Sequence, residues 1–215
     1  MPCAQAARPM ITDDARITDA KSCQVESWIR NNADSTEYWA LPACNFTGNL
    51  ELTAGAARTH AGAETYLSDF VLQGKTVLKP LEANGWGVGL TAGTDSHRHG
   101  HEAGRDWYAT VPASFSFQDD RVLLHANLGW LREQTQRTRA TWGLGTEIAL
   151  DQNNWLIAET FGQNQGKPNY QLGLRRWLLP GRVQIDATYG KRLGGNADEH
   201  WFSIGLRVLS APFLP

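Results

Sequence analysis

The stretch Val122-Leu123-Leu124-His125-Ala126-Asn127-Leu128-Gly129-Trp130 changes its chemical character with a period of two residues. Successive side chains of a strand point to opposite faces of a sheet, so one face of this stretch is apolar from Val122 to Trp130. The opposite face carries His125, Asn127 and Gly129. The same period returns in residues 183–190 and 202–208. The pattern predicts β-strands that are apolar on one side and polar on the other.

Runs of this kind, separated by turn residues, fill the chain from Cys23 onward. We expect about twelve strands, with ten as the alternative. The expected strands are residues 22–31, 35–45, 48–58, 66–79, 85–95, 106–117, 121–133, 138–150, 154–162, 169–179, 182–192 and 199–209. An even number of strands, each long enough to cross a bilayer when tilted, is typical of bacterial outer-membrane barrels. The sequence therefore predicts an all-β, antiparallel up-and-down transmembrane barrel.

The connections between the expected strands alternate between tight turns and longer polar loops. Asn45 to Thr47 and Pro180-Gly181 are examples of the tight turns, and Ser96 to Arg105 is the longest of the loops. Short turns lie on the periplasmic side of outer-membrane barrels, which predicts periplasmic termini.

The same alternation also suits a soluble periplasmic barrel that binds an apolar ligand among inward-facing apolar rows. The mean hydropathy of -0.41 does not decide between the two, because a barrel strand shows only every second side chain to lipid. The placement of aromatic residues favours the membrane, since such rings prefer the depth of the lipid headgroups. We expect interfacial rings at Trp86, Phe115, Phe117 and Trp155 on one boundary and at Trp107, Trp130, Tyr189, Trp201 and Phe202 on the other.

The N-terminal 20 residues are expected to precede a single barrel domain of residues 21–215. The Ala4-x-Ala6 pattern is typical of a secretory cleavage site and predicts the remnant of a signal peptide, with an Ala-rich disordered tip as the alternative. Residues 8–20 are expected to form a periplasmic extension that tucks into the barrel mouth as a partial plug.

Charged residues of both signs fall on the hidden face of the expected strands. Those assigned to the lumen by their parity are Glu51, Asp69, Lys75, His125, Glu147, Arg175, Asp186 and Arg207. The lumen is expected either to conduct or bind a small solute or to be filled by a network of salt bridges. Glu159 is ambiguous, because Trp155, Ile157 and Phe161 on the same side of its strand look lipid-facing. With 20 Lys and Arg against 22 Asp and Glu, the composition argues against a nucleic-acid partner.

Two cysteines lie opposite each other when residues are counted back from the first hairpin loop. We expect Cys23 and Cys44 to form a disulfide, which requires an oxidising compartment such as the periplasm. Two buried free thiols in a cytosolic protein are the alternative.

Two local clusters contain residue types that are found at sites of chemistry. The alternate histidines His97, His99 and His101 have side chains that bind transition metals, but a solvated loop is the favoured interpretation, and neither a metal nor a cofactor is expected. His125 with Ser114 or Ser116 has the residue types of a base and a nucleophile. Because His125 is expected to face inward, away from envelope lipids, enzyme activity is not expected.

Four segments of the sequence resemble segments of the outer-membrane barrels of the MetA-pathway of phenol degradation family. They are RPMITDDAR at 8–16, CQVESW at 23–28, GNLEL at 48–52 and WFSIGLR at 201–207. The resemblance implies a bacterial outer-membrane barrel, often described as a transporter, with a link to the uptake of aromatic compounds. The chain departs from outer-membrane barrels that end in an aromatic residue, because Leu214 and Pro215 follow Phe213.

The sequence therefore predicts a passive outer-membrane channel or transporter for small solutes, with aromatic compounds as one candidate class. Its expected partners are outer-membrane lipid and the solute, and protein partners are not indicated. A soluble barrel that binds an apolar ligand and a barrel enzyme that modifies envelope lipids are the alternatives.

Overall fold

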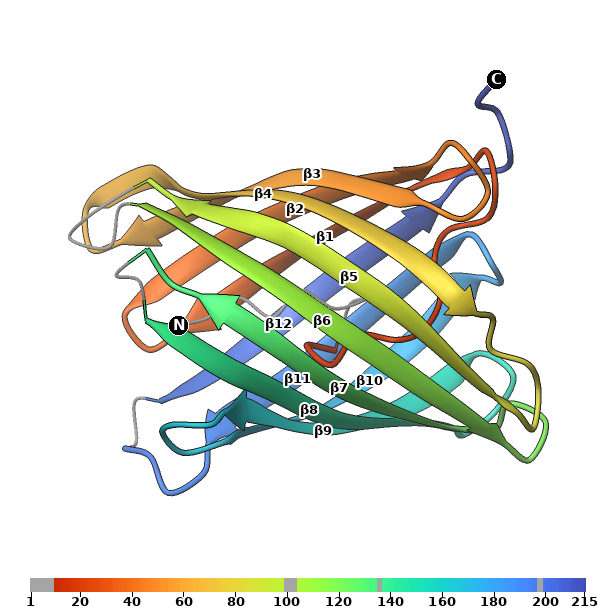
Figure 1. Ribbon diagram of the computed structural model, residues 1–215. Helices are drawn as coiled ribbons and strands as arrows, with labels where there is room; N and C mark the ends of the chain where they lie inside the picture. Colours follow the sequence, from red (N-terminus) through yellow and green to blue (C-terminus); the bar gives the residue numbers. More distant parts are fainter. Residues whose placement is uncertain (1–9, 99–103, 135–136, 197–198) are drawn as a thin grey trace.

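The computed structural model describes residues 10–98, 104–134, 137–196 and 199–215, so the expected signal remnant lies outside the described residues. The strands are β1 (Cys23–Asn32), β2 (Ser35–Asn45), β3 (Glu51–Ala61), β4 (Glu64–Lys79), β5 (Trp86–His97), β6 (Gly104–Phe117), β7 (Val122–Arg132), β8 (Thr138–Ala149), β9 (Asn154–Gln163), β10 (Asn169–Leu179), β11 (Val183–Arg192) and β12 (His200–Leu209). Each strand pairs antiparallel with the next, and β12 pairs with β1 (Figure 1). The predicted closed barrel of twelve antiparallel strands is confirmed.

The two ends of the barrel differ in their connections. One end, which we call the turn end, holds the connections β2–β3, β4–β5, β6–β7, β8–β9 and β10–β11. The start of β1 and the end of β12 lie at the same end. There the backbone N–H groups of Phe213 and Leu214 donate to the carbonyl of Lys21. The other connections lie at the opposite end, which we call the loop end. Among the described residues, no helix has the length and apolar character needed to cross a bilayer.

The tight turns are stabilised by local hydrogen bonds. In the β8–β9 turn, the Asp151 carboxylate accepts hydrogen bonds from the backbone N–H groups of Asn153 and Asn154 at 2.8 and 2.9 Å. These bonds stabilise the charged form and hold the pKa of Asp151 below its ordinary value. The β6–β7 turn instead uses three consecutive residues with positive φ, from Gln118 to Asp120. Such local chemistry fixes the register of each hairpin.

The apolar rows of the strands face outward. On β7, Leu124, Leu128 and Trp130 are exposed, whereas His125 and Asn127 are buried inside the barrel. The same division holds on β12, where every second residue from Phe202 to Val208 is exposed. This direction is the one that a hydrocarbon environment requires. The alternative of a soluble barrel with inward apolar rows is therefore wrong.

Two of the nine expected interfacial rings lie on the inner face instead. Trp201 is buried in the lumen, because a strand alternates its faces and the neighbouring Phe202 already points outward. Trp155 lies on the inner side of β9 with Ile157 and Glu159, both buried. On β9 both faces are largely apolar, so hydropathy alone could not assign its direction. The assignment of this row to the lipid face was wrong.

Part of the lumen wall carries an apolar cluster. Trp39, Leu41, Ala57 and Val71 are buried together on β2, β3 and β4, and Trp28 packs against them. The rings of Trp28 and Trp39 are stacked, with their centroids 5.2 Å apart. Side chains therefore fill this part of the interior.

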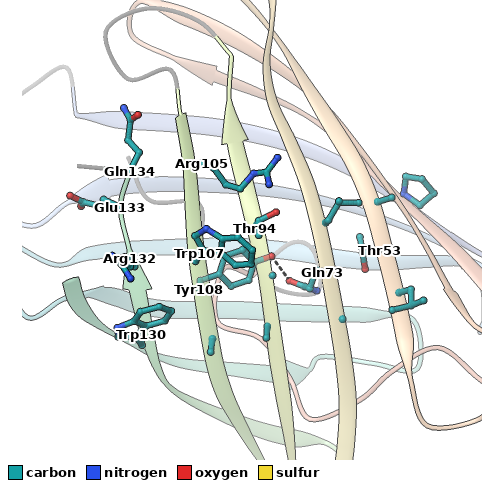
Figure 2. A pocket seen from close by; sticks show the side chains of 18 of the residues that line it. Thr53, Gln73, Thr94, Arg105, Trp107, Tyr108, Trp130, Arg132, Glu133 and Gln134 are labelled. Carbon is teal, nitrogen blue, oxygen red and sulfur yellow. Dashed lines mark hydrogen bonds between the residues drawn. The ribbon is translucent and has the colours of Figure 1, made fainter. Parts of the chain in front are cut away.

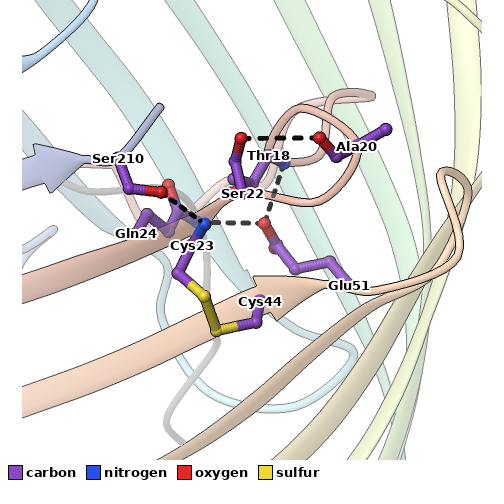
Figure 3. Close-up of a disulfide and its surroundings, with 8 residues drawn as sticks. All are labelled: Thr18, Ala20, Ser22, Cys23, Gln24, Cys44, Glu51 and Ser210. Atoms are coloured by element: carbon purple, nitrogen blue, oxygen red, sulfur yellow. Dashed lines mark hydrogen bonds between the residues drawn. A yellow bond between two sulfur atoms is a disulfide. The ribbon is translucent and has the colours of Figure 1, made fainter. Parts of the chain in front are cut away.

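The predicted disulfide joins the first two strands at the turn end. Cys23 and Cys44 are direct cross-strand partners in the β1–β2 register, and their sulfur atoms are bonded (Figure 3). Both side chains alternate with buried neighbours, Gln24 and Asn45, so the disulfide lies on the outer face.

Candidate functional site in the barrel lumen

The eight charged residues assigned to the lumen all belong to the inner face of the barrel. Glu51, Lys75, His125, Glu147, Arg175 and Asp186 are buried, and Asp69 and Arg207 are partly buried. They form separate groups rather than one network. Glu51 and Lys75 are cross-strand partners, as are Arg175 and Asp186. Asp69 lies apart from the others, beside His97 near the loop end.

Residues 10–22, which we call the N-terminal segment, run inside the barrel (Figure 1). They form no strand, and Met10, Thr12, Asp13, Ala15 and Thr18 are buried. A chain without strand pairing must satisfy its backbone groups in another way. Polar side chains of the wall take this role.

Glu159 holds the deepest part of the N-terminal segment. Its carboxylate accepts hydrogen bonds from the backbone N–H groups of Ile11 and Thr12 at 2.8 and 2.7 Å. Gln171 donates to the same carboxylate at 2.9 Å and accepts a hydrogen bond from the indole of Trp201. Glu159 is thus an inward-facing binding residue that hydropathy left ambiguous.

The middle of the segment is bound by side chains of β6 and β7. The Asn127 amide donates to the carbonyl of Asp13 at 2.8 Å and accepts from its N–H at 2.6 Å. The N–H of Ala15 donates to Ser114 Oγ at 2.8 Å. The side-chain amide of Asn127 therefore pairs with the segment as a neighbouring backbone would.

Ion pairs add charge complementarity to these contacts. Lys75 Nζ lies 2.6 Å from Asp13 Oδ1 and 3.2 Å from Asp14 Oδ1. The side chains of Lys75 and Asp13 are almost completely buried, and that of Asp14 is largely buried. The hydroxyl of Thr91 donates to the second oxygen of Asp13 at 3.0 Å. A buried charge is tolerated when it is both paired and hydrogen-bonded, as it is here.

The end of the segment nearest to β1 is held by Glu51. Its carboxylate accepts the N–H of Thr18 at 2.8 Å and the side-chain amide of Gln24 at 3.3 Å (Figure 3). The Asn45 amide donates to the carbonyl of Thr18 at 2.8 Å. The segment is therefore fixed along its length, from Glu159 to the start of β1.

Two glycines of β8 provide the space through which the segment passes. A Cβ atom added at Gly143 would lie 2.7 Å from Thr12 Oγ1, and one added at Gly145 would overlap the terminal methyl of Met10. Inward-facing glycines thus mark a close approach of another chain segment. These glycines are the feature of the sequence that indicates how deeply the segment enters the barrel.

A second group of inner-face residues lies on β6, β7, β8 and β10. Ser114 Oγ is 2.8 Å from His125 Nδ1, and His125 Nε2 is 3.3 Å from Glu147 Oε1. Glu147 also pairs with Arg175. The series Ser114, His125 and Glu147 resembles a nucleophile, a base and an orienting acid. Ser114 is, however, completely buried, and its hydroxyl accepts a hydrogen bond from the N–H of Ala15. The contacts that we observe attach the segment to the wall.

Little space remains between the segment and the wall. The cavity next to Asp13, Asp14 and Lys75 has a volume of about 30 Å³. That is room for about one or two water molecules. At this place the segment and the wall are therefore closely packed.

A much larger groove lies on the outside of the barrel, across β2 to β7 (Figure 2). It has a volume of about 1260 Å³, and the outward side chains Leu52, Leu72, Trp107 and Trp130 stand around the small residue Ala92. Because these side chains belong to the outer face, the groove is not a part of the lumen.

Solved structures of outer-membrane barrels share this fold. The KdgM porin in complex with disordered oligogalacturonate matches with a TM-score of 0.63 and 10% identity, covering 86% of this chain and 98% of the porin. The NanC porin matches with a TM-score of 0.60 and 9% identity over 86% and 98%. The COG4313 outer membrane channel from Pseudomonas putida F1 matches with a TM-score of 0.52 and 12% identity, covering 87% of this chain and 93% of the channel. At such identities the likeness concerns the fold.

Comparison with curated proteins gave no match. The resemblance to the MetA-pathway family is borne out only at the coarser level of an outer-membrane-type β-barrel. A family model described as "Uncharacterised conserved protein UCP029691" matches residues 2–209 of the chain. The chain therefore belongs to the family of uncharacterised conserved proteins UCP029691.

Proposed function

We propose that the protein is an outer-membrane channel for small solutes, closed in the described state by the N-terminal segment. The apolar outer face and the polar inner face of the barrel support a position in the bilayer. The shared fold with porins and with an outer-membrane channel supports a role in passage. In this proposal the turn end and both termini are periplasmic.

The observation that carries the proposal is the polar character of the contacts that hold the segment. Glu159, Asn127, Ser114, Glu51 and Lys75 bind it by hydrogen bonds and ion pairs. When such a bond opens in a hydrated lumen, water replaces it, so each bond between neutral groups contributes only about 1 kcal/mol net and each bond to a charged group about 1.5–3 kcal/mol. A segment held in this way can leave the lumen, because the polar side chains of the barrel wall that it uncovers can then bind water.

The proposed solutes are small, and aromatic compounds are a candidate class. Trp28, Trp39, Phe161 and Trp201 face the interior, and Arg30 lies 4.5 Å over the ring of Trp201. Planar rings and a guanidinium form stacking and cation–π contacts with planar solutes. The proposed lumen residues of the sequence analysis, from Glu51 to Arg207, would line the path once the segment is displaced.

In this proposal the barrel is a channel and not an enzyme. The arrangement of Ser114 with His125 that suggests catalysis lies under the segment, and its serine oxygen accepts the N–H of Ala15. Lipid substrates would meet the outer face of the barrel, which these residues do not reach.

Conductance in planar bilayers tests the proposal with two truncations. Deletion of residues 1–20 removes most of the N-terminal segment and is expected to raise the single-channel conductance about tenfold or more over the full chain. Deletion of residues 1–9 is the matched control, because it leaves the segment in the lumen, and it is expected to conduct like the full chain.

Both truncated barrels are first checked for their β-sheet circular dichroism and for heat-dependent migration in gels. A folded barrel without residues 1–20 that conducts no better than the full chain would contradict the proposal, and would leave a closed structural barrel. Swelling of vesicles in an aromatic acid and in a sugar acid of similar size then tests the class of solute.

A further inference from the structure

Three neighbouring strands bring four ionisable side chains together on the inner face near the loop end. Asp69 of β4 lies directly opposite His97 of β5, and Asp95 of β5 lies directly opposite Asp106 of β6. Like charges at directly opposed positions destabilise a sheet. The chain therefore carries a local electrostatic cost at this place, and the inference drawn from it does not rest on the proposed channel.

Asp95 is the least satisfied member of this cluster. It is 2% exposed, and neither of its carboxylate oxygens has a hydrogen-bond partner. A buried carboxylate without a hydrogen-bond donor destabilises the fold. Its oxygens nevertheless lie close to the ligand atoms of Asp69 and His97, with one atom from each of the three residues within 4.8 Å of the others.

His97 is held between two further carboxylates. Its Nδ1 lies 2.7 Å from Asp69 Oδ1, and its Nε2 lies 3.3 Å from Asp106 Oδ2. The other oxygen of Asp106 accepts the backbone N–H of Gln134 at 2.8 Å. Asp106 is thus oriented from outside the cluster and in turn orients the imidazole.

We propose that Asp69, Asp95 and His97 bind a divalent transition-metal ion, for which Zn²⁺ is the representative probe. On binding, the proton that His97 Nδ1 shares with Asp69 Oδ1 would leave to solvent, so that Nδ1 and the Asp69 carboxylate both become ligands of the ion. The Nε2–H of His97 would donate to Asp106, an arrangement that is common behind metal-bound histidines. Two carboxylates and one imidazole are ligands that Zn²⁺ accepts, with water in the remaining position. A dication also neutralises the unpaired charge of Asp95.

The donor set favours a transition metal over Ca²⁺. Calcium takes six to eight oxygen ligands, whereas the cluster offers an imidazole and a small number of carboxylates. Around Zn²⁺ with bonds of about 2 Å, ligand atoms lie roughly 3.3 Å apart. The more distant ligand atoms, which lie within 4.8 Å of one another, would therefore close by up to about 1.5 Å on binding, whereas His97 Nδ1 and Asp69 Oδ1, now 2.7 Å apart, would move slightly apart. The ion would join β4 to β5 at the mouth of the lumen.

The experiment compares zinc binding and thermal stability in detergent after removal of metals by EDTA. The full chain is expected to bind one Zn²⁺, measured by calorimetry, and to melt at a higher temperature with Zn²⁺ than without. Asp95→Asn is expected to bind Zn²⁺ at least about tenfold more weakly. Without metal, this variant should melt no lower than the full chain, because a buried unpaired charge has been removed.

Two controls separate this site from other histidines. His60→Gln changes an exposed histidine and should leave zinc binding unchanged. The double variant His99→Gln/His101→Gln changes residues outside the described part of the chain and should still bind one ion. Ca²⁺ should not raise the melting temperature at the same concentration.

Three results would overturn the proposal. They are the absence of zinc binding by the full chain, unchanged affinity in Asp95→Asn, and loss of binding in the double histidine variant. A lower melting temperature of metal-free Asp95→Asn would also count against it, since that result would mean that Asp95 already has a stabilising partner.

Discussion

Lys75→Met is expected to lower the free energy of unfolding by about 3–5 kcal/mol, because it removes one partner of a buried ion pair. The carboxyl groups of Asp13 and Asp14 would remain in the lumen without the ammonium that lies 2.6 and 3.2 Å from them. Methionine retains most of the length of the lysine stem, so the loss concerns charge rather than volume. Denaturant titration of the barrel in lipid vesicles measures the change.

The N-terminal segment can relieve part of this cost by leaving the lumen. Trypsin cleavage after Arg16 is therefore expected to be faster in Lys75→Met than in the parent. Lys191→Met, on the outer face of β11, is the matched control. It should change neither the free energy of unfolding nor the rate of trypsin cleavage after Arg16. The triple variant Asp13→Asn/Asp14→Asn/Lys75→Met should regain most of the lost stability. Equal stability and equal cleavage in Lys75→Met and the parent would show that the ion pair does not hold the segment.

Leu128→Arg is expected to destabilise the inserted barrel by up to about 4 kcal/mol, because an arginine on the lipid face near the bilayer centre loses its hydration. Leu128 is 73% exposed on the outer face and lies in the middle part of β7. Unfolding in phospholipid vesicles, compared with the parent, gives the difference.

Ala63→Arg is the control for this prediction. Ala63 is exposed in the β3–β4 connection at the loop end, where water reaches the new charge. Its effect is expected to stay below about 0.5 kcal/mol. If both arginines cost the same, the outer face of β7 is not in contact with hydrocarbon, and the position of the barrel in a bilayer is contradicted.

The strands and their direction were predictable because most of them carry one clearly apolar row. On β7 and β12 the apolar residues alternate with polar residues or glycine, and this contrast decides which side faces out. On β9 the contrast is missing, since Leu156 faces out and Ile157 faces in. The misplacement of Trp155, and the ambiguity of Glu159 with it, follow from that missing contrast.

The contacts of the lumen were less predictable, because they join distant parts of the chain. The sequence predicted that residues 8–20 enter the mouth of the barrel, but Thr12 meets Glu159 across 147 positions. Likewise, the spacing of Asp95 and His97 places both on one face of β5, whereas only the strand register brings Asp69 to them. Such pairings depend on the closed barrel, which local patterns do not specify.

A disulfide trap between the N-terminal segment and β8 tests the central claim, that residues 10–22 close the lumen. A Cβ atom built at Gly143 lies 3.3 Å from the Cβ of Thr12, close to the separation found in disulfides. The variant Thr12→Cys/Gly143→Cys, prepared with Cys3→Ser so that no other free thiol is present, is oxidised in the folded state and analysed by peptide mass spectrometry. A bond between positions 12 and 143 is predicted. Free thiols at both positions in a folded barrel would contradict the account.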